Sequence, residues 1–204
     1  MTEGEPSFWS EFHAAAAHRP PRELLVRTLN FFDVERRAPG VAVDLGCGSG
    51  PDTVELLRRG WAVHAVDSDR QGLAMLTKAA EPDWQDRLHT HPVGLEDFDF
   101  PTCDLIWASY ALPFCPRDAW PQLLTRAIGA LRMGGRFAGD MFGNEHAWSS
   151  EPDVLTRTEA QFRADLRPLQ IEAFDIENGY RVSGDEVTRW HAFAFAARVV
   201  EPVQ

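Results

Sequence analysis

The sequence has few of the features that mark a metal centre, a disulfide framework or a membrane protein. Its three cysteines, Cys47, Cys103 and Cys115, form no C-x-x-C pair and no metal-ligand spacing. No stretch reaches the roughly 18 uncharged apolar residues of a membrane span. Residues 1–10 lack a basic region followed by an apolar run, the pattern of a secretion signal. We therefore expect a cytoplasmic protein without a bound metal.

Positive charge is also scarce. Lysine and arginine together number 20 against 31 aspartates and glutamates, so the net charge is −11, and Lys78 is the only lysine. A chain this acidic repels nucleic acid and anionic membranes, and we expect neither as a partner. Its 204 residues, 44% of them hydrophobic, suffice for one globular domain with a full core. The remaining expectation is a small-molecule substrate, bound by a monomer or a homodimer.

A glycine turn near residue 45 organises the rest of the chain. The apolar run 41–45 reads as a strand, and Gly46, Gly48 and Gly50 follow it at alternate positions. Glycine lets the backbone turn tightly and lets a ligand approach the main chain. Pro51 then stands where a helix can begin. Strand, glycine turn and helix together predict the nucleotide-binding unit of a doubly wound α/β sheet.

Acidic residues around this turn separate two candidate ligands. A second strand, 61–67, ends on Asp67, nineteen residues after Gly48, about where an acid reaches the hydroxyls of a bound ribose. A nicotinamide dinucleotide would need Gly or Ala where Pro51 stands, and its diphosphate would meet Asp44 and Asp52 at the helix start. Two carboxylates suit instead the sulfonium and ammonium groups of S-adenosylmethionine, which we expect as the cofactor.

The rest of the chain alternates between helical and strand patterns. Two helices are expected before the first strand, where they cover a sheet face or form a lid over the ligand. After Asp67 the predicted elements are a helix, two strands, a second helix that includes Leu131, a strand and a short helix. Two alternating runs joined by a turn then predict a terminal hairpin. In order, these elements are residues 8–16, 24–32, 71–80, 88–93, 103–110, 117–131, 136–142, 158–161, 171–182 and 187–200.

Three features together resemble the class I S-adenosylmethionine-dependent methyltransferases over essentially the whole chain. They are the motif 44–50 with Asp67, the helix-to-strand junction 131–137 and the terminal hairpin. Residues 109–116 and 142–148 look like those of a group of small bacterial members. The resemblance implies a Rossmann-like sheet of seven strands, the last antiparallel, with helices on both faces. It also implies one domain, 1–204, with an N-terminal helical lid (1–38) and a core (39–204).

The resemblance further assigns the cofactor site. Backbone groups of the glycine turn would contact the methionyl and ribose parts, and Asp67 would accept two hydrogen bonds from the ribose. Many members have an aspartate where Gly94 stands, so adenine here would rely on Leu95 and Glu96. The predicted cofactor-binding residues are Asp44, Gly46, Cys47, Gly48, Asp67, Ser68, Leu95, Glu96 and Ser109.

The acceptor pocket is expected beyond the same sheet edge, in the connections after the fourth and fifth strands. An aromatic wall there suits an apolar or planar acceptor. The predicted pocket residues are Tyr110, Phe114, Phe142, His146 and Trp148, and Tyr110 and His146 are the candidate bases. His191 and His64 are expected to be structural.

These patterns predict methyl transfer from S-adenosylmethionine to a small-molecule acceptor, by in-line displacement at the sulfonium methyl. Two alternatives stay open. One is a cofactor-binding fold that serves as an interaction module without catalysis, which Gly94 in place of an acid supports. The other is a nicotinamide oxidoreductase, against which Pro51 and Asp52 argue.

Overall fold

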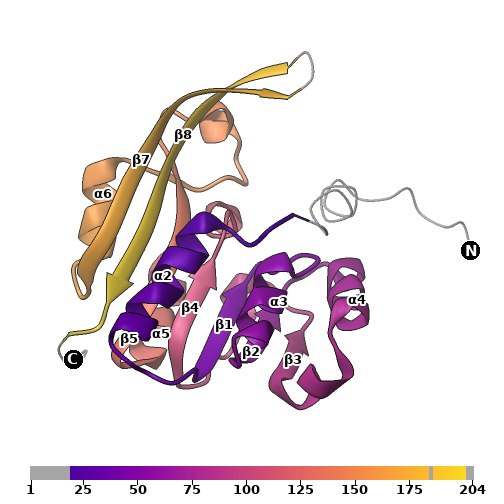
Figure 1. The fold of residues 1–204 in the computed structure, drawn as a ribbon. Coiled ribbons are helices and arrows are strands. Elements are labelled where there is room, and N and C mark those ends of the chain that lie inside the picture. The colour runs from indigo at the N-terminus through magenta and orange to yellow at the C-terminus, as the bar shows by residue number, and fades with distance from the viewer. Residues whose placement is uncertain (1–18, 184–185, 201–204) are drawn as a thin grey trace, which may run out of the picture.

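The computed structural model describes residues 19–183 and 186–200. A mixed sheet runs through it with helices on both sides (Figure 1). The strands are β1 Val41–Leu45, β2 Ala62–Val66, β3 Leu88–His91, β4 Cys103–Ala108, β5 Leu131–Gly143, β6 Thr156–Arg157, β7 Gln170–Ser183 and β8 Glu186–Arg198. The α-helices are α2 Glu23–Val34, α3 Pro51–Arg58, α4 Arg70–Ala79, α5 Trp120–Ala130 and α6 Glu159–Asp165. Short 3₁₀ helices are η1 Pro82–Arg87, η2 Leu95–Asp97, η3 Leu112–Phe114 and η4 Ala147–Ser150.

The strand order is β3-β2-β1-β4-β5-β8-β7, and the two-residue strand β6 pairs with β5 outside this path. Strands β1 to β5 pair in parallel, whereas β8 is antiparallel to both β5 and β7. The order reverses between β1 and β4, so the carboxyl ends of these two strands open the crevice where ligands bind in such sheets. The predicted doubly wound fold with an antiparallel last strand is confirmed.

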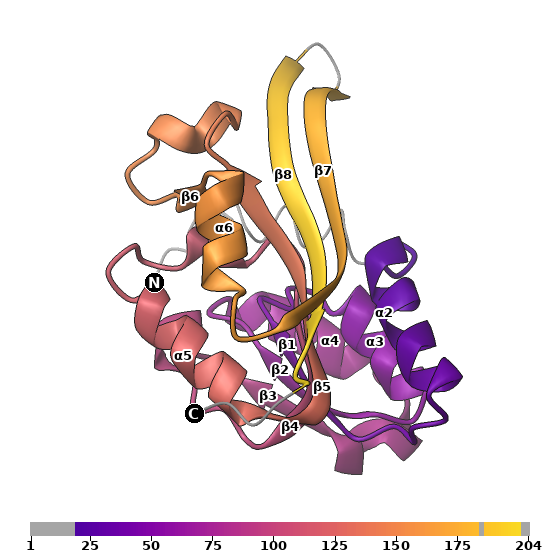
Figure 2. The same ribbon diagram turned by 90° about the vertical axis from the view of Figure 1, so that its left-hand side faces the viewer.

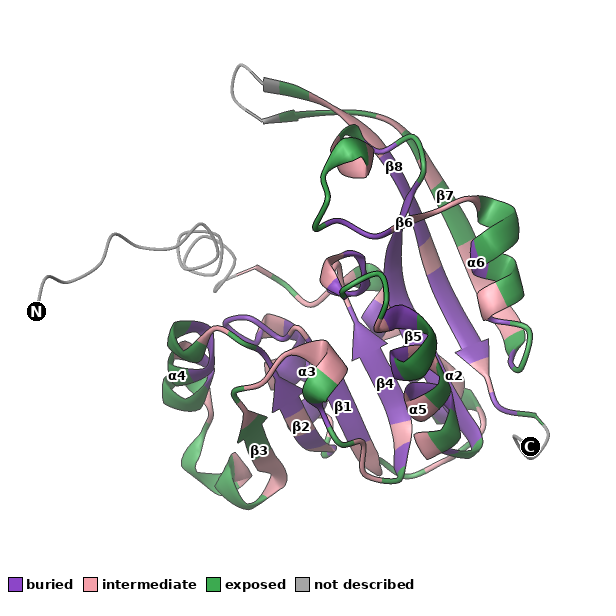
Figure 3. Cartoon of the chain, turned by 180° about the vertical axis from the view of Figure 1, so that it is seen from behind, coloured by how far each residue is buried: buried purple, intermediate pink, exposed green. Residues whose placement is uncertain are grey.

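Each face of the sheet buries a separate apolar layer. In Figure 2, helices α5 and α6 lie on one side of the sheet, and α2, α3 and α4 lie on the other. The α2 layer joins Leu25, Leu29 and Phe32 to Trp107 of β4. Figure 3 shows the central strands buried and the outer helix surfaces exposed. Burial of these stripes fixes the helices, because removing a Leu or Phe side chain from water stabilises by about 1.5–3 kcal/mol.

A buried arginine fixes α2 to the sheet and to the hairpin. Arg136 on β5 is fully buried, and its guanidinium donates to Glu35, just after α2, and to Glu172 on β7 at 2.6 Å. The same group lies 4.6 Å from the centre of the Phe32 ring. A buried arginine is tolerated only when such partners satisfy it. This arrangement sets the position of α2, whose start faces the ligand crevice.

The structure differs from the sequence-based expectation at two places. Leu131 was expected on a helical stripe but begins β5, because α5 ends at Ala130 and the chain extends directly into the strand. The second predicted helix, α2, covers a sheet face. The first, 8–16, lies outside the described residues, so the lid (1–38) and the single-domain division stay predictions. Among described residues, no helix is long and apolar enough to cross a membrane.

Candidate functional site

The glycine turn after β1 adopts backbone conformations that only glycine takes easily. Gly46, Gly48 and Gly50 have φ of 68°, 54° and 81°, all in the left-handed region. A Cβ on Gly46 would lie 2.4 Å from the Cβ of Ala111, which follows β4. Pro51 begins α3 directly after the turn. The turn therefore presents backbone, rather than side chains, to the crevice at the strand ends.

Asp67, at the end of β2, holds this turn. Its Oδ2 accepts from the Gly48 backbone N–H and its Oδ1 from the Asp69 N–H, both at 2.8 Å. The side chain is largely buried but lines the cavity described below. Each carboxylate oxygen has a second lone pair, and a carboxylate can accept up to four hydrogen bonds. Asp67 can therefore support the turn and accept two ligand hydroxyls together.

The two carboxylates that the sequence placed at the mouth lie elsewhere. Asp44 is 2% exposed and accepts a 2.5 Å hydrogen bond from Thr53, and burial with repulsion from Asp52 raises its pKa to about 7. Asp52 accepts from the Arg19 guanidinium at 2.8 Å and from the Trp107 indole at 3.0 Å. Neither lines the cavity. The expected electrostatic exclusion of a diphosphate is thus weakened, because Arg19, 33 positions away in the sequence, neutralises Asp52.

Glu96 occupies the space beside Gly94. If Gly94 carried a Cβ, that atom would lie 2.7 Å from Oε1 of Glu96. The carboxylate of Glu96 therefore stands where the side chain of an acid at position 94 would extend. Gly94, Leu95 and Glu96 all line the cavity near Asp67. A carboxylate therefore lies beside Gly94, although position 94 itself has no acidic side chain.

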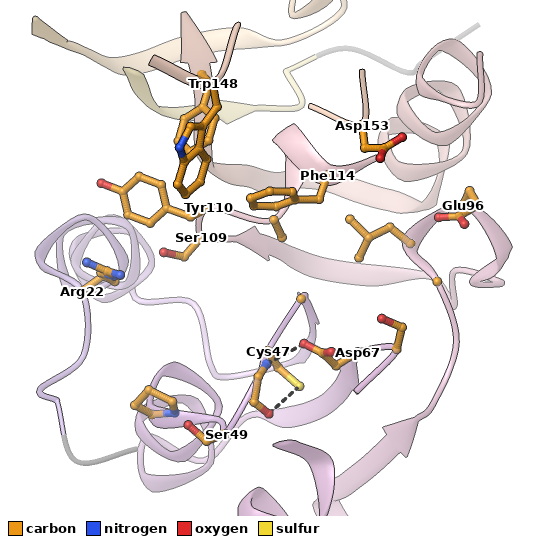
Figure 4. A pocket seen from close by; sticks show the side chains of 18 of the residues that line it. Arg22, Cys47, Ser49, Asp67, Glu96, Ser109, Tyr110, Phe114, Trp148 and Asp153 are labelled. Atoms are coloured by element: carbon orange, nitrogen blue, oxygen red, sulfur yellow. Dashed lines mark hydrogen bonds between the residues drawn. The ribbon is translucent and has the colours of Figure 1, made fainter. Parts of the chain in front are cut away.

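Tyr110, just after β4, has a strained backbone conformation at the crevice. Tyr110 has φ of 51°, a conformation that costs about 1–3 kcal/mol for a non-glycine residue. Strain of this kind is often found at functional sites. The conformation places the Tyr110 ring in the cavity, beside Ser109 (Figure 4). Burial raises the pKa of the Tyr110 phenol, so the ring stays protonated near neutral pH.

An aromatic wall faces the glycine turn across the cavity. Four of its side chains were predicted to line the acceptor pocket: Tyr110, Phe114, Phe142 and Trp148. Trp190 from β8 also lines the cavity. Phe142 contacts Trp190 and Trp148 edge-on, with ring centroids 5.5 and 5.9 Å apart. Edge-on and offset contacts are the favoured geometries of such rings. Sequence reasoning missed Trp190 because only the hairpin register brings it to this edge.

His146 does not line the cavity. Its ring stacks on Phe142 at 3.8 Å, is 1% exposed, and accepts at Nδ1 from the Trp148 N–H. Burial, with the Arg181 charge, lowers the pKa of His146 to about 4. The reason for its absence from the wall is that Phe142 covers it. His191, expected to be structural, accepts from the Glu145 N–H, and His64 contacts His91 in the sheet.

Three arginines also line the cavity, none of them predicted: Arg19, Arg22 and Arg181. Arg181 on β7 lies 3.6 Å from the Trp190 ring centre, donates to the Tyr110 hydroxyl at 3.2 Å and pairs with Glu177. Arg22, just before α2, lies 4.8 Å from the Tyr110 ring centre. No sequence motif marks them, because they come from segments far from the glycine turn.

One cavity of about 550 Å³ joins these parts. It is lined by eight of the nine predicted cofactor residues, all except Asp44, and by four of the five predicted pocket residues, all except His146. Its acidic residues, Asp67, Glu96 and Asp153, lie apart from Arg22 in Figure 4. Within the part of the chain that the structure describes, no cluster of His, Cys, Asp and Glu is arranged to hold a metal ion.

Comparison with known families gives a match over part of the chain. A family described as a methyltransferase domain matches residues 42–135, a little under half of the chain and the segment that carries the glycine turn, Asp67 and Glu96. No curated protein matches the sequence. The domain match over residues 42–135 and the shared fold both agree with the predicted similarity to the class I S-adenosylmethionine-dependent methyltransferases. The predicted activity class and the predicted cofactor, S-adenosylmethionine, are those of this superfamily.

Solved structures share the fold at low sequence identity. TehB from Haemophilus influenzae is 15% identical with a TM-score of 0.70, over 85% of this chain and 61% of that one. This chain thus spans under two thirds of the length of TehB. The 1,6-didemethyltoxoflavin-N1-methyltransferase of Burkholderia thailandensis, solved with its substrate and S-adenosylhomocysteine, is 21% identical with a TM-score of 0.65, over 98% and 93%. Magnesium protoporphyrin IX methyltransferase from Synechocystis, solved with S-adenosylmethionine, is 14% identical with a TM-score of 0.60, over 95% and 86%.

Proposed function

We propose that this protein transfers a methyl group from S-adenosylmethionine to a small, planar acceptor. The observation that carries the proposal is the single cavity, with the glycine turn and Asp67 on one side and the aromatic wall on the other. Such a cavity holds a nucleoside and a second ring compound next to each other. The toxoflavin and porphyrin methyltransferases of similar fold act on planar heteroaromatic compounds, as their names say, which supports a small planar acceptor here.

The chain has groups that fit each part of the cofactor. The bare backbone at Gly46 to Gly48 accommodates the ribose and methionyl portions, and Asp67 accepts from the two ribose hydroxyls. Ser68, Leu95 and Glu96 surround the purine, with the Glu96 carboxylate accepting from the adenine amino group. Cys47 takes part through its backbone. Asp44 acts from below the turn, through its hydrogen bond to Thr53 on α3.

When bound, the cofactor supplies an electrophilic methyl group on a positively charged sulfur. The protein's own task is to align the acceptor with that group and to exclude water. Tyr110, Phe114 and Trp148 do both by packing against an acceptor ring. Orientation of two reactants in this way contributes about 7–11 kcal/mol in good cases. Aromatic faces at this position also favour a cationic sulfur through cation–π contact.

The two residues that the sequence suggested as a base for removing a proton from the acceptor are poorly suited to that role. His146 is covered by Phe142, and burial keeps the Tyr110 phenol protonated, so neither acts readily as a base. Tyr110 can instead hold the acceptor by hydrogen bonding. Asp140, on β5 behind Tyr110, does not line the cavity, so we assign it no contact with the acceptor. An acceptor that reacts as a thiolate, a neutral amine or an acidic phenol therefore fits this site best.

Isothermal calorimetry tests the proposal. We expect one molecule of S-adenosylhomocysteine to bind per chain, and NADH to give no heat. Binding of NADH alone would favour the oxidoreductase alternative. Absence of binding by either S-adenosylhomocysteine or S-adenosylmethionine, on protein shown to be folded, would reject the methyltransferase. Cofactor binding without turnover across a broad acceptor screen would support the interaction module.

A further inference from the structure

The three arginines at the cavity differ in how their charges are compensated. Arg19 pairs with Asp52 at 2.8 Å, and Arg181 pairs with Glu177. Arg22 has no ion pair and no side-chain hydrogen bond with any described residue, and its Nε is buried without a hydrogen-bond partner. A buried donor without a partner costs about 1–3 kcal/mol, more for a charged group. A charge left in this state in a cavity wall calls for an anionic ligand.

The position of Arg22 is fixed by its surroundings. Its backbone N–H donates to Asp52 at 2.9 Å, so the residue is held at the start of α2 independently of its side chain. The guanidinium lies over the face of Tyr110, 4.8 Å from the ring centre. The guanidinium is planar and its N–H groups point outward from its edge. An arginine that stacks its face on an aromatic ring can therefore still bind a carboxylate at that edge with two parallel hydrogen bonds.

Positive and negative side chains lie at different parts of the cavity, which agrees with an anionic ligand at Arg22. In Figure 4, Arg22 lies beside Ser109 and Tyr110, whereas Glu96 and Asp153 lie at the opposite side. Asp140 is a buried acid on which the Arg22 charge acts, and it forms no ion pair with Arg22 among the described residues. Burial raises the pKa of Asp140 to about 7, and the Arg22 charge opposes that rise. Asp140 therefore does not fully compensate Arg22 near neutral pH.

We propose that Arg22 is the carboxylate-binding residue of this cavity, with Tyr110 as the ring that holds its guanidinium in place. The inference rests on the proposed function. Two ligands of a methyltransferase could supply the carboxylate: the methionyl end of the cofactor, or an acidic group on the planar acceptor. Both would place an oxygen pair at the guanidinium edge, and an experiment with two arms separates them.

The first arm compares two cofactor analogues by calorimetry, S-adenosylhomocysteine and 5′-methylthioadenosine, which lacks the amino-acid portion. The second arm titrates the protein, saturated with S-adenosylhomocysteine, with 2-naphthoate and with its uncharged amide. The variants are Arg22→Gln, Arg22→Lys and the control Arg27→Gln, which removes an exposed arginine of the same helix paired with Asp175. Unchanged melting temperatures exclude a folding effect.

We expect Arg22→Gln to weaken one carboxylate ligand at least tenfold, Arg22→Lys to lose less, and the uncharged partner and the control to be unaffected. Weaker S-adenosylhomocysteine assigns the carboxylate to the cofactor, and weaker 2-naphthoate assigns it to the acceptor. Equal losses for charged and uncharged ligands, or no loss in either arm, overturn the inference. Wild-type protein that binds neither cofactor analogue refutes the proposed function instead, and the naphthoate arm on free protein then still tests Arg22.

Discussion

The two sides of the cavity are built in different ways. The glycine-turn side comes from one short segment of chain, 44–52, and from Asp67 at the end of the neighbouring strand, and it acts largely through backbone groups. The aromatic side is assembled from side chains of η3, β5, η4, β7 and β8, together with Tyr110 after β4 and Arg22 before α2, which only the tertiary fold brings together. The glycine-turn side can therefore be predicted from the sequence. The aromatic side depends on register and packing.

The comparison also concerns charge. On the glycine-turn side, Asp67 is satisfied by two backbone N–H groups, and Asp52 is paired with Arg19. On the aromatic side, the Arg22 side chain has no ion pair or hydrogen bond with a described residue, and Asp140 is buried with a pKa raised to about 7. The acidic groups of the glycine-turn side therefore have their partners in the protein without a ligand. On the aromatic side, a ligand would supply the charge that compensates Arg22. This suits the part of a site that selects a substrate.

The largest effect is expected at Asp67. Asp67→Ala removes the acceptor of the Gly48 N–H and the proposed acceptor of the ribose hydroxyls together. We expect the affinity for S-adenosylhomocysteine to fall about 100-fold or more, since each of the two bonds to the charged acceptor contributes about 1.5–3 kcal/mol. Calorimetry measures the change. An affinity within threefold of the wild type would remove Asp67 from the site.

Next in size is the effect at Glu96. Glu96→Ala should weaken S-adenosylhomocysteine by about tenfold, through loss of one charge-assisted hydrogen bond to adenine. Because Glu96 fills the space beside Gly94, the double variant Glu96→Ala with Gly94→Asp should recover part of the affinity. Gly94→Asp by itself should bind worse than the double variant, since the two carboxylates would collide. If adding Gly94→Asp to Glu96→Ala recovers no affinity, Glu96 does not take the role of an acid at position 94.

A third effect, on stability rather than on affinity, is expected for Asp140. Its folded pKa, about 7, lies above the ordinary 3.8, so the protonated carboxyl stabilises the fold at low pH, and this contribution is lost as the pH rises from about 4 to about 7. Asp140→Asn should therefore gain stability relative to the wild type with rising pH, by roughly 2–3 kcal/mol between pH 5 and pH 8. Denaturant unfolding of both proteins at each pH measures the difference. A difference that does not change with pH would refute the raised pKa.

The smallest effect is expected at the aromatic wall. Trp148→Ala and Phe114→Ala should leave the affinity for S-adenosylhomocysteine within about twofold, because these rings lie on the acceptor side of the cavity. Both should instead weaken a planar ligand added to the cofactor complex, through loss of buried ring contacts. A tenfold loss of cofactor affinity in either variant would show that the two sides are not separate.

Local patterns carried most of the fold and one side of the site. The glycine turn and the hairpin are recognisable from short sequence patterns, and Asp67 is recognisable because it ends a strand nineteen residues after Gly48. Leu131 was misplaced because helical spacing continues past the true end of α5. The pairing of Arg19 with Asp52, the cover of Phe142 over His146 and the arrival of Trp190 and Arg181 all depend on contacts distant in sequence. No spacing rule anticipates such contacts.

A crystal structure of the complex with S-adenosylhomocysteine tests the account most directly. The account predicts the ribose hydroxyls within hydrogen-bond distance of the Asp67 carboxylate, adenine beside Leu95 and Glu96, and the sulfur facing the wall formed by Tyr110, Phe114 and Trp148. A ligand whose ribose lies away from Asp67, or whose sulfur faces away from these rings, would contradict it.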